Sequence, residues 1–129
     1  MCGANVMRDE LFSSELIDIA GIPIVRVCGE IDLYNVSEFR KALEAGIELG
    51  TPALVVDLSG ISYIDSAGLS ILLLAYKSLA LRNAHLHVVA DPGRPGVRRV
   101  LEITRVDSFI KVSDTVDQIL NELRYSPAV

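Results

Sequence analysis

The 129-residue sequence predicts an α/β fold: a single domain with a central, mostly parallel sheet, an antiparallel N-terminal edge and about four flanking helices. Two observations lead to this fold class. Short apolar runs rich in β-branched residues alternate with longer segments whose apolar residues recur at helical spacing, which is the element order of a parallel α/β sheet. The first two strand-like runs are separated by only three residues, so they predict a hairpin and therefore an antiparallel edge.

The length and composition bound the organisation of the chain. A chain of 129 residues, half of them hydrophobic, fits one domain with a real core. We expect a flexible N-terminal arm at residues 1–12, the domain at 13–125 and a C-terminal tail at 126–129. Cys2 and Cys28 lack a CxxC spacing, and we expect both to be free thiols in a reducing compartment, with a disulfide bridge or a redox pair as the alternative.

Charge and hydropathy narrow the class of partner and the location. Twelve basic against 17 acidic residues give a net charge of −5, which argues against a dedicated nucleic-acid binder. No apolar run approaches the ~18 residues that cross a bilayer, so we expect no membrane partner. The N-terminus lacks the basic start and apolar core of a signal peptide, and we expect a cytoplasmic protein.

The first half of the chain gives the hairpin and one helix. Strands are expected at 16–20 and 24–28, with Gly21-Ile22-Pro23 as the turn between them. Apolar and small residues then recur at helical spacing over 36–49. Ser37 is the expected start of this helix, and Gly50-Thr51-Pro52 closes it.

The second half contains a buried strand and three further helices. The apolar run at 54–57 predicts an interior strand that ends at Ser59-Gly60. A helix from about Ser66 to Arg82 follows it. The remaining expected elements are a strand at 86–89, a short helix at 95–103, a strand at 109–112 and a helix capped by Ser113-Asp114 that ends near Arg124.

The segment Asp65-Ser66-Ala67-Gly68-Leu69 marks the start of the central helix. Asp and Ser favour helix starts, where the first turn carries unpaired N–H groups and a partial positive charge. A hydroxyl placed there is exposed and could accept a phosphoryl group that those donors would tolerate. The alternative is that Ser66 only caps the helix.

Two motifs resemble the STAS domain of bacterial anti-sigma-factor antagonists. The family carries an Asp-Ser-(Ser/Thr)-Gly-Leu run after a hydrophobic strand, and here residues 65–69 match it. It also carries Gly-Glu-(Leu/Ile)-Asp before the first helix, which stands here as Gly29-Glu30-Ile31-Asp32. The resemblance covers roughly residues 15–123. Ala67 departs from the pattern, because many members have a second hydroxyl there, and it leaves Ser66 as the single acceptor in the motif.

The resemblance implies a regulatory protein that is not an enzyme and has no cofactor of its own. In such a bacterial partner-switching system, the unphosphorylated antagonist binds an anti-sigma factor that is also a serine kinase, and so frees a sigma factor for stress-response transcription. The kinase uses ATP to phosphorylate Ser66, which weakens the complex, and a separate serine phosphatase restores it. The alternative is a STAS scaffold or transport-associated assembly module, in which Ser66 is an inert interface residue.

The partner-binding residues expected from the motifs are Asp32, Asp65, Ser66, Ala67 and Gly68. Asp65 is expected to cap the helix, to present Ser66 and to add charge at the site. The resemblance implies that the loop carrying Asp32 lies beside the phosphorylation site and takes part in partner recognition. Gly68 either allows close approach of the backbone or takes part in the partner contact.

The helix after Ser66 has two apolar faces at ~100° per residue. One face is assigned to the core and comprises Leu69, Leu72, Leu73, Tyr76, Leu79 and Ala80. The other contains Ile71, Leu74 and Ala75. We expect Ile71 and Leu74 to form a protein-protein surface, either for the kinase or for a homodimer. Burial under a neighbouring helix or the N-terminal arm is the open alternative.

Other chemistries find little support in the sequence. The only histidines, His85 and His87, share a strand face without an apparent third metal ligand, so no metal site is expected. A serine hydrolase is disfavoured because no Gly-x-Ser-x-Gly nucleophile elbow is present. The segment at residues 91–96 lacks the lysine and glycine spacing of a phosphate loop, and a turn is expected there.

Overall fold

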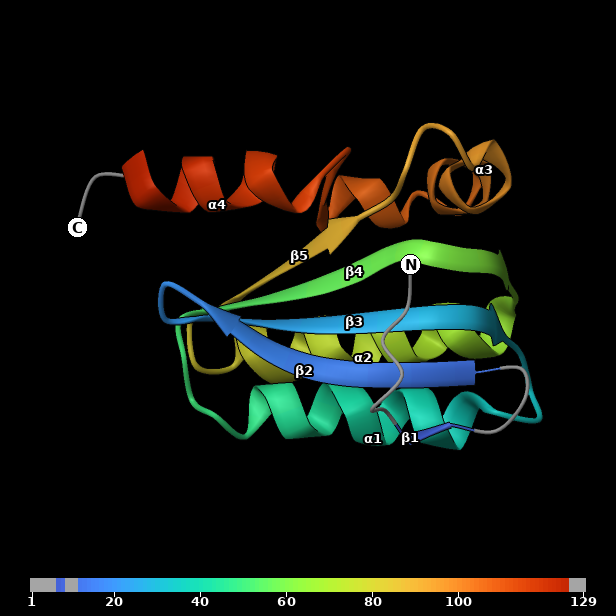
Figure 1. Ribbon diagram of the computed structural model, residues 1–129, viewed down its shortest axis with the longest axis horizontal. Coiled ribbons are helices and arrows are strands. Elements are labelled where there is room, and N and C mark those ends of the chain that lie inside the picture. The colour runs from blue at the N-terminus through green and yellow to red at the C-terminus, as the bar shows by residue number, and fades with distance from the viewer. Residues whose placement is uncertain (1–6, 9–11, 126–129) are drawn as a thin grey trace.

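The computed structural model describes residues 7–8 and 12–125 of the chain (Figure 1). The strands are β1 (Met7–Arg8), β2 (Phe12–Ile19), β3 (Ile22–Ile31), β4 (Ala53–Ile64), β5 (His85–Val89) and β6 (Lys111–Ser113). The helices are α1 (Val36–Ile47), α2 (Ser66–Ala80), α3 (Pro95–Ile103), a 3-10 helix (Val106–Ser108) and α4 (Val116–Tyr125).

The strands form one sheet in the order β1-β2-β3-β4-β5-β6. The pairs β1/β2 and β2/β3 are antiparallel, whereas β3/β4, β4/β5 and β5/β6 are parallel. Together with the four α-helices of the described residues, this confirms the predicted α/β class with an antiparallel N-terminal edge. Each helix in the described part of the chain is too short or too polar to cross a membrane.

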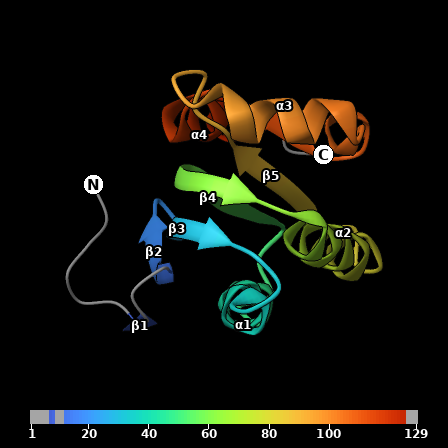
Figure 2. The ribbon, with the colours of Figure 1, turned by 90° about the vertical axis from the view of Figure 1, so that its right-hand side faces the viewer.

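Helices cover both faces of the sheet. The larger core cluster holds Leu54 and Val56 of β4 together with buried residues of α1, α2 and α3. Val55, between them on β4, points to the other face and joins a smaller cluster with Ile119 of α4. This alternation follows from the two-residue period of a strand. Figure 2 shows α1 and α2 side by side on one side of the sheet, with α4 on the opposite side.

The hairpin turns earlier than the sequence predicted. Its two loop residues are Ala20 and Gly21, both with positive φ (55° and 84°), as a tight two-residue hairpin turn requires. The Asp18 carboxylate accepts a 3.0 Å hydrogen bond from the Gly21 N–H. The predicted turn Gly21-Ile22-Pro23 was therefore wrong, because Ile22 and Pro23 already belong to β3.

Strand β4 continues well beyond its predicted end at Ser59-Gly60. The Asp57 carboxylate accepts hydrogen bonds from the Ser59 N–H (2.9 Å) and the Ser59 hydroxyl (2.6 Å). The register with β3 shifts at this point, so the pair forms an irregularity rather than an end. As a result, β3 and β4 run together to Ile31 and Ile64, which are paired.

The segment expected as an arm contributes to the sheet where it is described. Met7–Arg8 pair with β2, and Phe12 is buried edge-on against Phe39 with ring centroids 6.3 Å apart. The rest of the predicted arm (1–6 and 9–11) and the predicted tail at 126–129 lie outside the described residues.

Cys28 is disulfide-bonded, so the predicted free thiol is wrong for this residue. The missing CxxC spacing excluded only a local pair of cysteines and gave no information on longer-range bonds. The prediction for Cys2 falls outside the described residues.

Candidate functional site

The ends of β3 and β4 bring the two sequence motifs to one edge of the sheet. Ile31 pairs with Ile64, and the Asp65 N–H donates a 3.1 Å hydrogen bond to the Ile31 carbonyl oxygen. Asp32 directly follows Ile31, so the loops carrying Asp32 and Asp65 are neighbours, as the resemblance implied. In a parallel sheet this carboxyl edge is where binding sites are usually built.

Asp65 is the N-cap of α2, as predicted. Its Oδ1 atom accepts hydrogen bonds from the N–H groups of Ala67 (2.9 Å) and Gly68 (3.3 Å). Two of the first-turn donors are therefore already satisfied by Asp65. Several first-turn donors were expected close to a phosphate on Ser66, and the Asp65 cap leaves fewer of them free.

Ser66 is the first residue of α2 and is exposed. Its carbonyl oxygen accepts a 2.9 Å hydrogen bond from the Ser70 hydroxyl, one turn further along the helix. Among the described residues, no group is hydrogen-bonded to the hydroxyl of Ser66 itself. The alternative in which Ser66 caps the helix is wrong, because the cap is Asp65. The hydroxyl thus has no structural task in the described part of the chain.

The loop from β3 to α1 is fixed by a reciprocal pair of side chains. Asp32 Oδ1 accepts from the N–H groups of Tyr34 (2.9 Å) and Asn35 (3.2 Å). The Asn35 side chain is buried, accepts from the Asp32 N–H (2.9 Å) and donates to the Glu30 carbonyl oxygen (2.7 Å). Asn35 directly precedes α1, which begins at Val36, so the predicted start at Ser37 was one residue late.

Three exposed apolar side chains near this edge were missed by the sequence analysis. Leu33 and Tyr34 on the fixed loop are 71% and 93% exposed, and Tyr63 at the end of β4 is half-exposed. An exposed tyrosine on a fixed loop is typical of protein-binding surfaces. The sequence signal that could have identified two of them is the apolar pair Leu33-Tyr34 in the short connection between a strand and a helix.

Gly68 allows the first turn of α2 to lie directly on the sheet. A Cβ atom at this position would be 2.7 Å from both Ile31 Cγ2 and Ile64 Cγ1. This is far inside van der Waals contact, so the close approach requires glycine here. Gly68 is buried and Ala67 is half-buried. Their roles in partner binding stay predictions.

The buried face of α2 differs from the predicted stripe. Leu69, Leu72 and Leu79 are buried, and Leu73 and Tyr76 are half-buried. Two residues of the helix contradict the assignment.

Ala80 was assigned to the core and is exposed, while Ala75 was assigned to the second face and is buried. The physical reason is that α1 packs beside α2 and covers the arc that carries Ala75. Ile71 is half-buried against the main core, and Leu74 is 53% exposed. The open alternative, burial under a neighbouring helix, therefore holds for Ala75 and in part for Ile71.

The histidines lie away from this edge of the sheet. His85 is exposed at the start of β5, and His87, in the middle of the strand, is half-buried. Burial lowers the pKa of His87, and the nearby His85 lowers it further. The His87 Nδ1 atom is buried and has no hydrogen-bond partner in the described chain. Residues 7–8 and 12–125 contain no group of three ligands suited to a metal ion.

Comparison with known proteins gives consistent similarities. Residues 14–119 match the family model described as STAS domain. The anti-sigma-B factor antagonist of Staphylococcus aureus is 32% identical over 90 residues, which cover 70% of this chain and 82% of that protein.

Similarities to solved structures extend over most of the chain. An anti-sigma factor antagonist from Mycobacterium paratuberculosis is 32% identical with a TM-score of 0.80, over 88% of this chain and 94% of that chain. The Bacillus cell fate determinant SpoIIAA in its phosphorylated form has a TM-score of 0.62 at 18% identity, over 86% of this chain and 99% of that chain. The latter similarity concerns the fold.

Proposed function

This chain belongs to the STAS domain family, and we propose that it is an anti-sigma-factor antagonist whose partner binding is controlled by phosphorylation of Ser66. The relatives from Staphylococcus aureus and Mycobacterium paratuberculosis, each 32% identical, support the antagonist role. The observation that carries the switch is the Ser66 hydroxyl, which is exposed at the start of α2 and unused by the described fold.

In the proposed cycle, the unphosphorylated protein binds an anti-sigma factor that is a serine kinase, and a sigma factor is released. The kinase transfers the γ-phosphoryl group of its ATP to the Ser66 oxygen, and the complex weakens. A serine phosphatase hydrolyses the phosphate and restores binding. Both catalytic steps, the phosphoryl transfer and the hydrolysis, belong to the partners, and this chain contributes the acceptor and the surface around it in the cytoplasm.

The switch acts through charge. A phosphoserine carries nearly two negative charges, and at Ser66 these would stand next to the Asp65 carboxylate. The dipole of α2 favours an anion at this end, so the free domain accepts the phosphate without unfolding. In a closely fitted interface the same charge is desolvated and unpaired, which costs several kcal/mol.

The fold does not depend on Ser66, which suits a residue that is modified and restored repeatedly. Asp65 caps α2 with its own carboxylate, and Gly68 seats the helix on the sheet. The surface that the partner meets would then be Ser66 with the fixed loop of Asp32, Leu33 and Tyr34. Phosphorylation changes the charge of this surface and leaves its shape in place.

Phosphosite mapping tests the proposal. The protein is incubated with ATP and, separately, with each anti-sigma serine kinase of the source genome, and the modified residue is located by mass spectrometry. We expect one phosphate, on Ser66, and none in Ser66→Ala. Ser70→Ala is the matched control, because Ser70 is an exposed serine one turn away, and it should be modified like the wild type. Modification elsewhere, or none, would favour the assembly-module alternative.

A further inference from the structure

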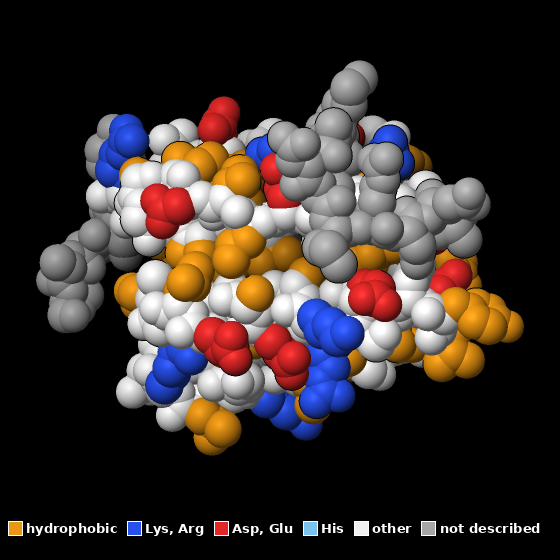
Figure 3. Space-filling view, turned by 60° about the horizontal axis from the view of Figure 1, so that its bottom comes forward, with side chains coloured by type: hydrophobic (Ala, Val, Ile, Leu, Met, Phe, Trp, Pro, Cys, Tyr) orange, Lys and Arg blue, Asp and Glu red, His pale blue; other side chains and the backbone are white. Residues whose placement is uncertain are grey.

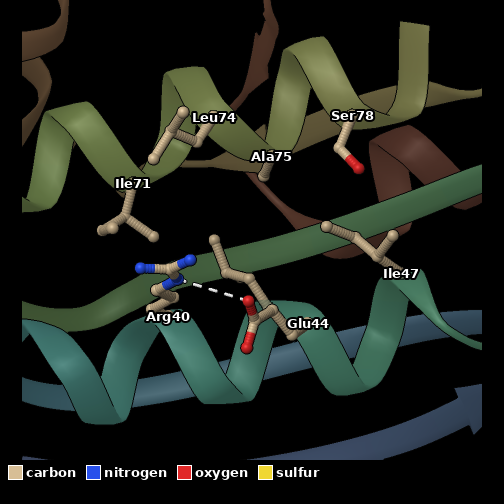
Figure 4. Close-up of a pocket in the computed structure, with 8 residues that line it drawn as sticks. Arg40, Glu44, Ile47, Ile71, Leu74, Ala75 and Ser78 are labelled. Carbon is tan, nitrogen blue, oxygen red and sulfur yellow. Dashed lines mark hydrogen bonds and ion pairs between the residues drawn. The ribbon is translucent and has the colours of Figure 1, made fainter. Parts of the chain in front are cut away.

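A groove runs between α1 and α2. It is lined by Arg40, Leu43, Glu44 and Ile47 of α1 and by Ile71, Leu74, Ala75 and Ser78 of α2. Figure 3 shows the face of the molecule on the α1 side, where apolar side chains lie beside acidic and basic ones. In Figure 4 the side chains of the two helices face one another across the groove, with Ile71 opposite Arg40.

The groove has an apolar floor and defined walls. Leu43 and Ala75 are buried at its base, while Leu74 leaves about half of its side chain open to solvent. On the α1 side, Arg40 Nε and Glu44 Oε2 form a 3.2 Å ion pair, so the charges on that wall neutralise each other. At the far end of the helices, an Arg82 guanidinium N–H donates to the Ile47 carbonyl oxygen (2.9 Å) and ties the turn after α2 to the last residue of α1.

The size of the groove indicates the kind of occupant. Its volume is about 210 Å³, below the ~300 Å³ at which pockets for small-molecule ligands begin. An apolar floor with a neutral rim and this volume fits one or two apolar side chains from another protein. Such a pocket beside an interface is where anchor residues usually insert.

The groove is continuous with the Ser66 face. Ser66, Ser70 and Leu74 follow one another at a spacing of four residues and therefore lie along one side of α2. At a rise of 1.5 Å per residue, Leu74 stands about 12 Å along the helix from Ser66. A partner that rests on Ser66 reaches Leu74 and the groove without leaving this side of the helix.

We propose that the anti-sigma kinase inserts an apolar side chain into the α1/α2 groove, and that this contact supplies affinity which phosphorylation of Ser66 leaves in place. The inference rests on the proposed function and extends its interface. A second copy of this chain is the weaker occupant, because each copy has a net charge of −5 and two copies repel. The continuity with Ser66 places the groove within reach of the same partner.

The test is calorimetric titration of full-length variants against the kinase that phosphorylates Ser66, with a non-hydrolysable ATP analogue present. Leu74→Ser and Leu74→Glu should each raise the Kd at least about tenfold. Ile103→Glu is the matched control, since Ile103 is an exposed apolar residue on α3 that does not line the groove, and it should bind within about twofold of the wild type. The double variant Ser66→Asp/Leu74→Ser should show roughly the product of the two single effects, as expected for separate contacts.

The possible outcomes distinguish a failure of the groove proposal from a failure of the proposed function. If both Leu74 variants bind like Ile103→Glu while Ser66→Asp binds weakly, the groove proposal is overturned and the proposed function stands. If the wild type binds no anti-sigma kinase, the proposed function fails and the groove proposal fails with it. A wild-type dimer in sedimentation that Leu74→Glu dissociates would assign the groove to a second copy and overturn the proposal. Equal urea midpoints for all variants exclude unfolding as the cause.

Discussion

The Asp65 N–H donates a 3.1 Å hydrogen bond to the Ile31 carbonyl oxygen, and this bond joins the first residue after β4 to the last residue of β3. It holds the Ser66 helix start against the loop of Asp32. Two further contacts fix the site on either side of it: the Asp65 cap on α2 and the Asn35 bonds across the loop. The proposed binding edge is therefore preorganised, and its parts can be removed one at a time.

Asp65→Ala should destabilise the domain by about 1 kcal/mol, the usual cost of losing an N-cap. The reason is that the N–H groups of Ala67 and Gly68 lose the carboxylate oxygen they share. Urea unfolding measures the change. Asp65→Asn keeps a cap oxygen and is the control, so a loss as large as that of Asp65→Ala would show that the charge rather than the cap matters.

Gly68→Ala should destabilise the domain by about 1–3 kcal/mol, as overpacked core positions do. The added methyl group meets branched carbons of Ile31 and Ile64 at 2.7 Å, which cannot swing away. Gly96→Ala on α3 is the control, because nothing lies within 4 Å of its Cβ position, and it should be neutral or stabilising through helix propensity. Comparable melting temperatures for the two variants would contradict the close approach of α2 to the sheet.

Asn35→Ala should cost about 1–3 kcal/mol, because it removes a buried side chain and leaves the half-buried Glu30 carbonyl oxygen without its 2.7 Å donor. It should also weaken kinase binding, since the loop presenting Leu33 and Tyr34 loses its anchor. Ser37→Ala, at an exposed position, should change neither quantity. Chemical denaturation and calorimetric binding on the same samples check both expectations. A Ser37 effect as large as that of Asn35 would contradict the anchoring role of Asn35.

His87 should make the domain less stable in mild acid. Burial, followed by the proximity of His85, lowers the pKa of His87 below the 6.5 of an unfolded histidine. Between these two pKa values the unfolded state binds more protons, so stability is complete above pH 6.5 and falls as the pH is lowered through that value. Thermal midpoints from pH 7.5 to 5.5 should therefore drop more for the wild type than for His87→Leu. Parallel curves would contradict this role.

The fold class was predictable because its signals are local. Period-two and period-3.6 apolar patterns identify strands and helices, and parallel sheets need helical crossovers. The end of β4 could not be predicted, because Ser59-Gly60 resembles a strand terminus in sequence. The pairing of β4 with β3, which resumes after a register shift and runs on to Ile64, shows that the strand continues through an irregularity.

The site was predictable where it depends on a single residue type at a helix start, as for the Asp65 cap. The buried face of α2 could not be predicted, because the helical pattern alone does not reveal which part of the helix surface a neighbouring helix covers. Ala75 fits under α1 because it is small, and Leu74 beside it stays half-exposed. Asn35 was missed because its partners, Glu30 and Asp32, become neighbours only when the loop folds.

The central claim is that the charge on Ser66 controls partner binding. Calorimetric titration of Ser66→Ala and Ser66→Asp against the cognate anti-sigma kinase, with a non-hydrolysable ATP analogue, tests it most directly. Both variants should melt within a few degrees of the wild type, because Asp65 caps α2 without help from Ser66. Ser66→Ala should bind as tightly as the unphosphorylated protein. Ser66→Asp should bind at least about tenfold more weakly, which corresponds to a loss of ~1.4 kcal/mol or more in binding free energy. Equal affinities for the two variants, with unchanged melting temperatures, would contradict the claim.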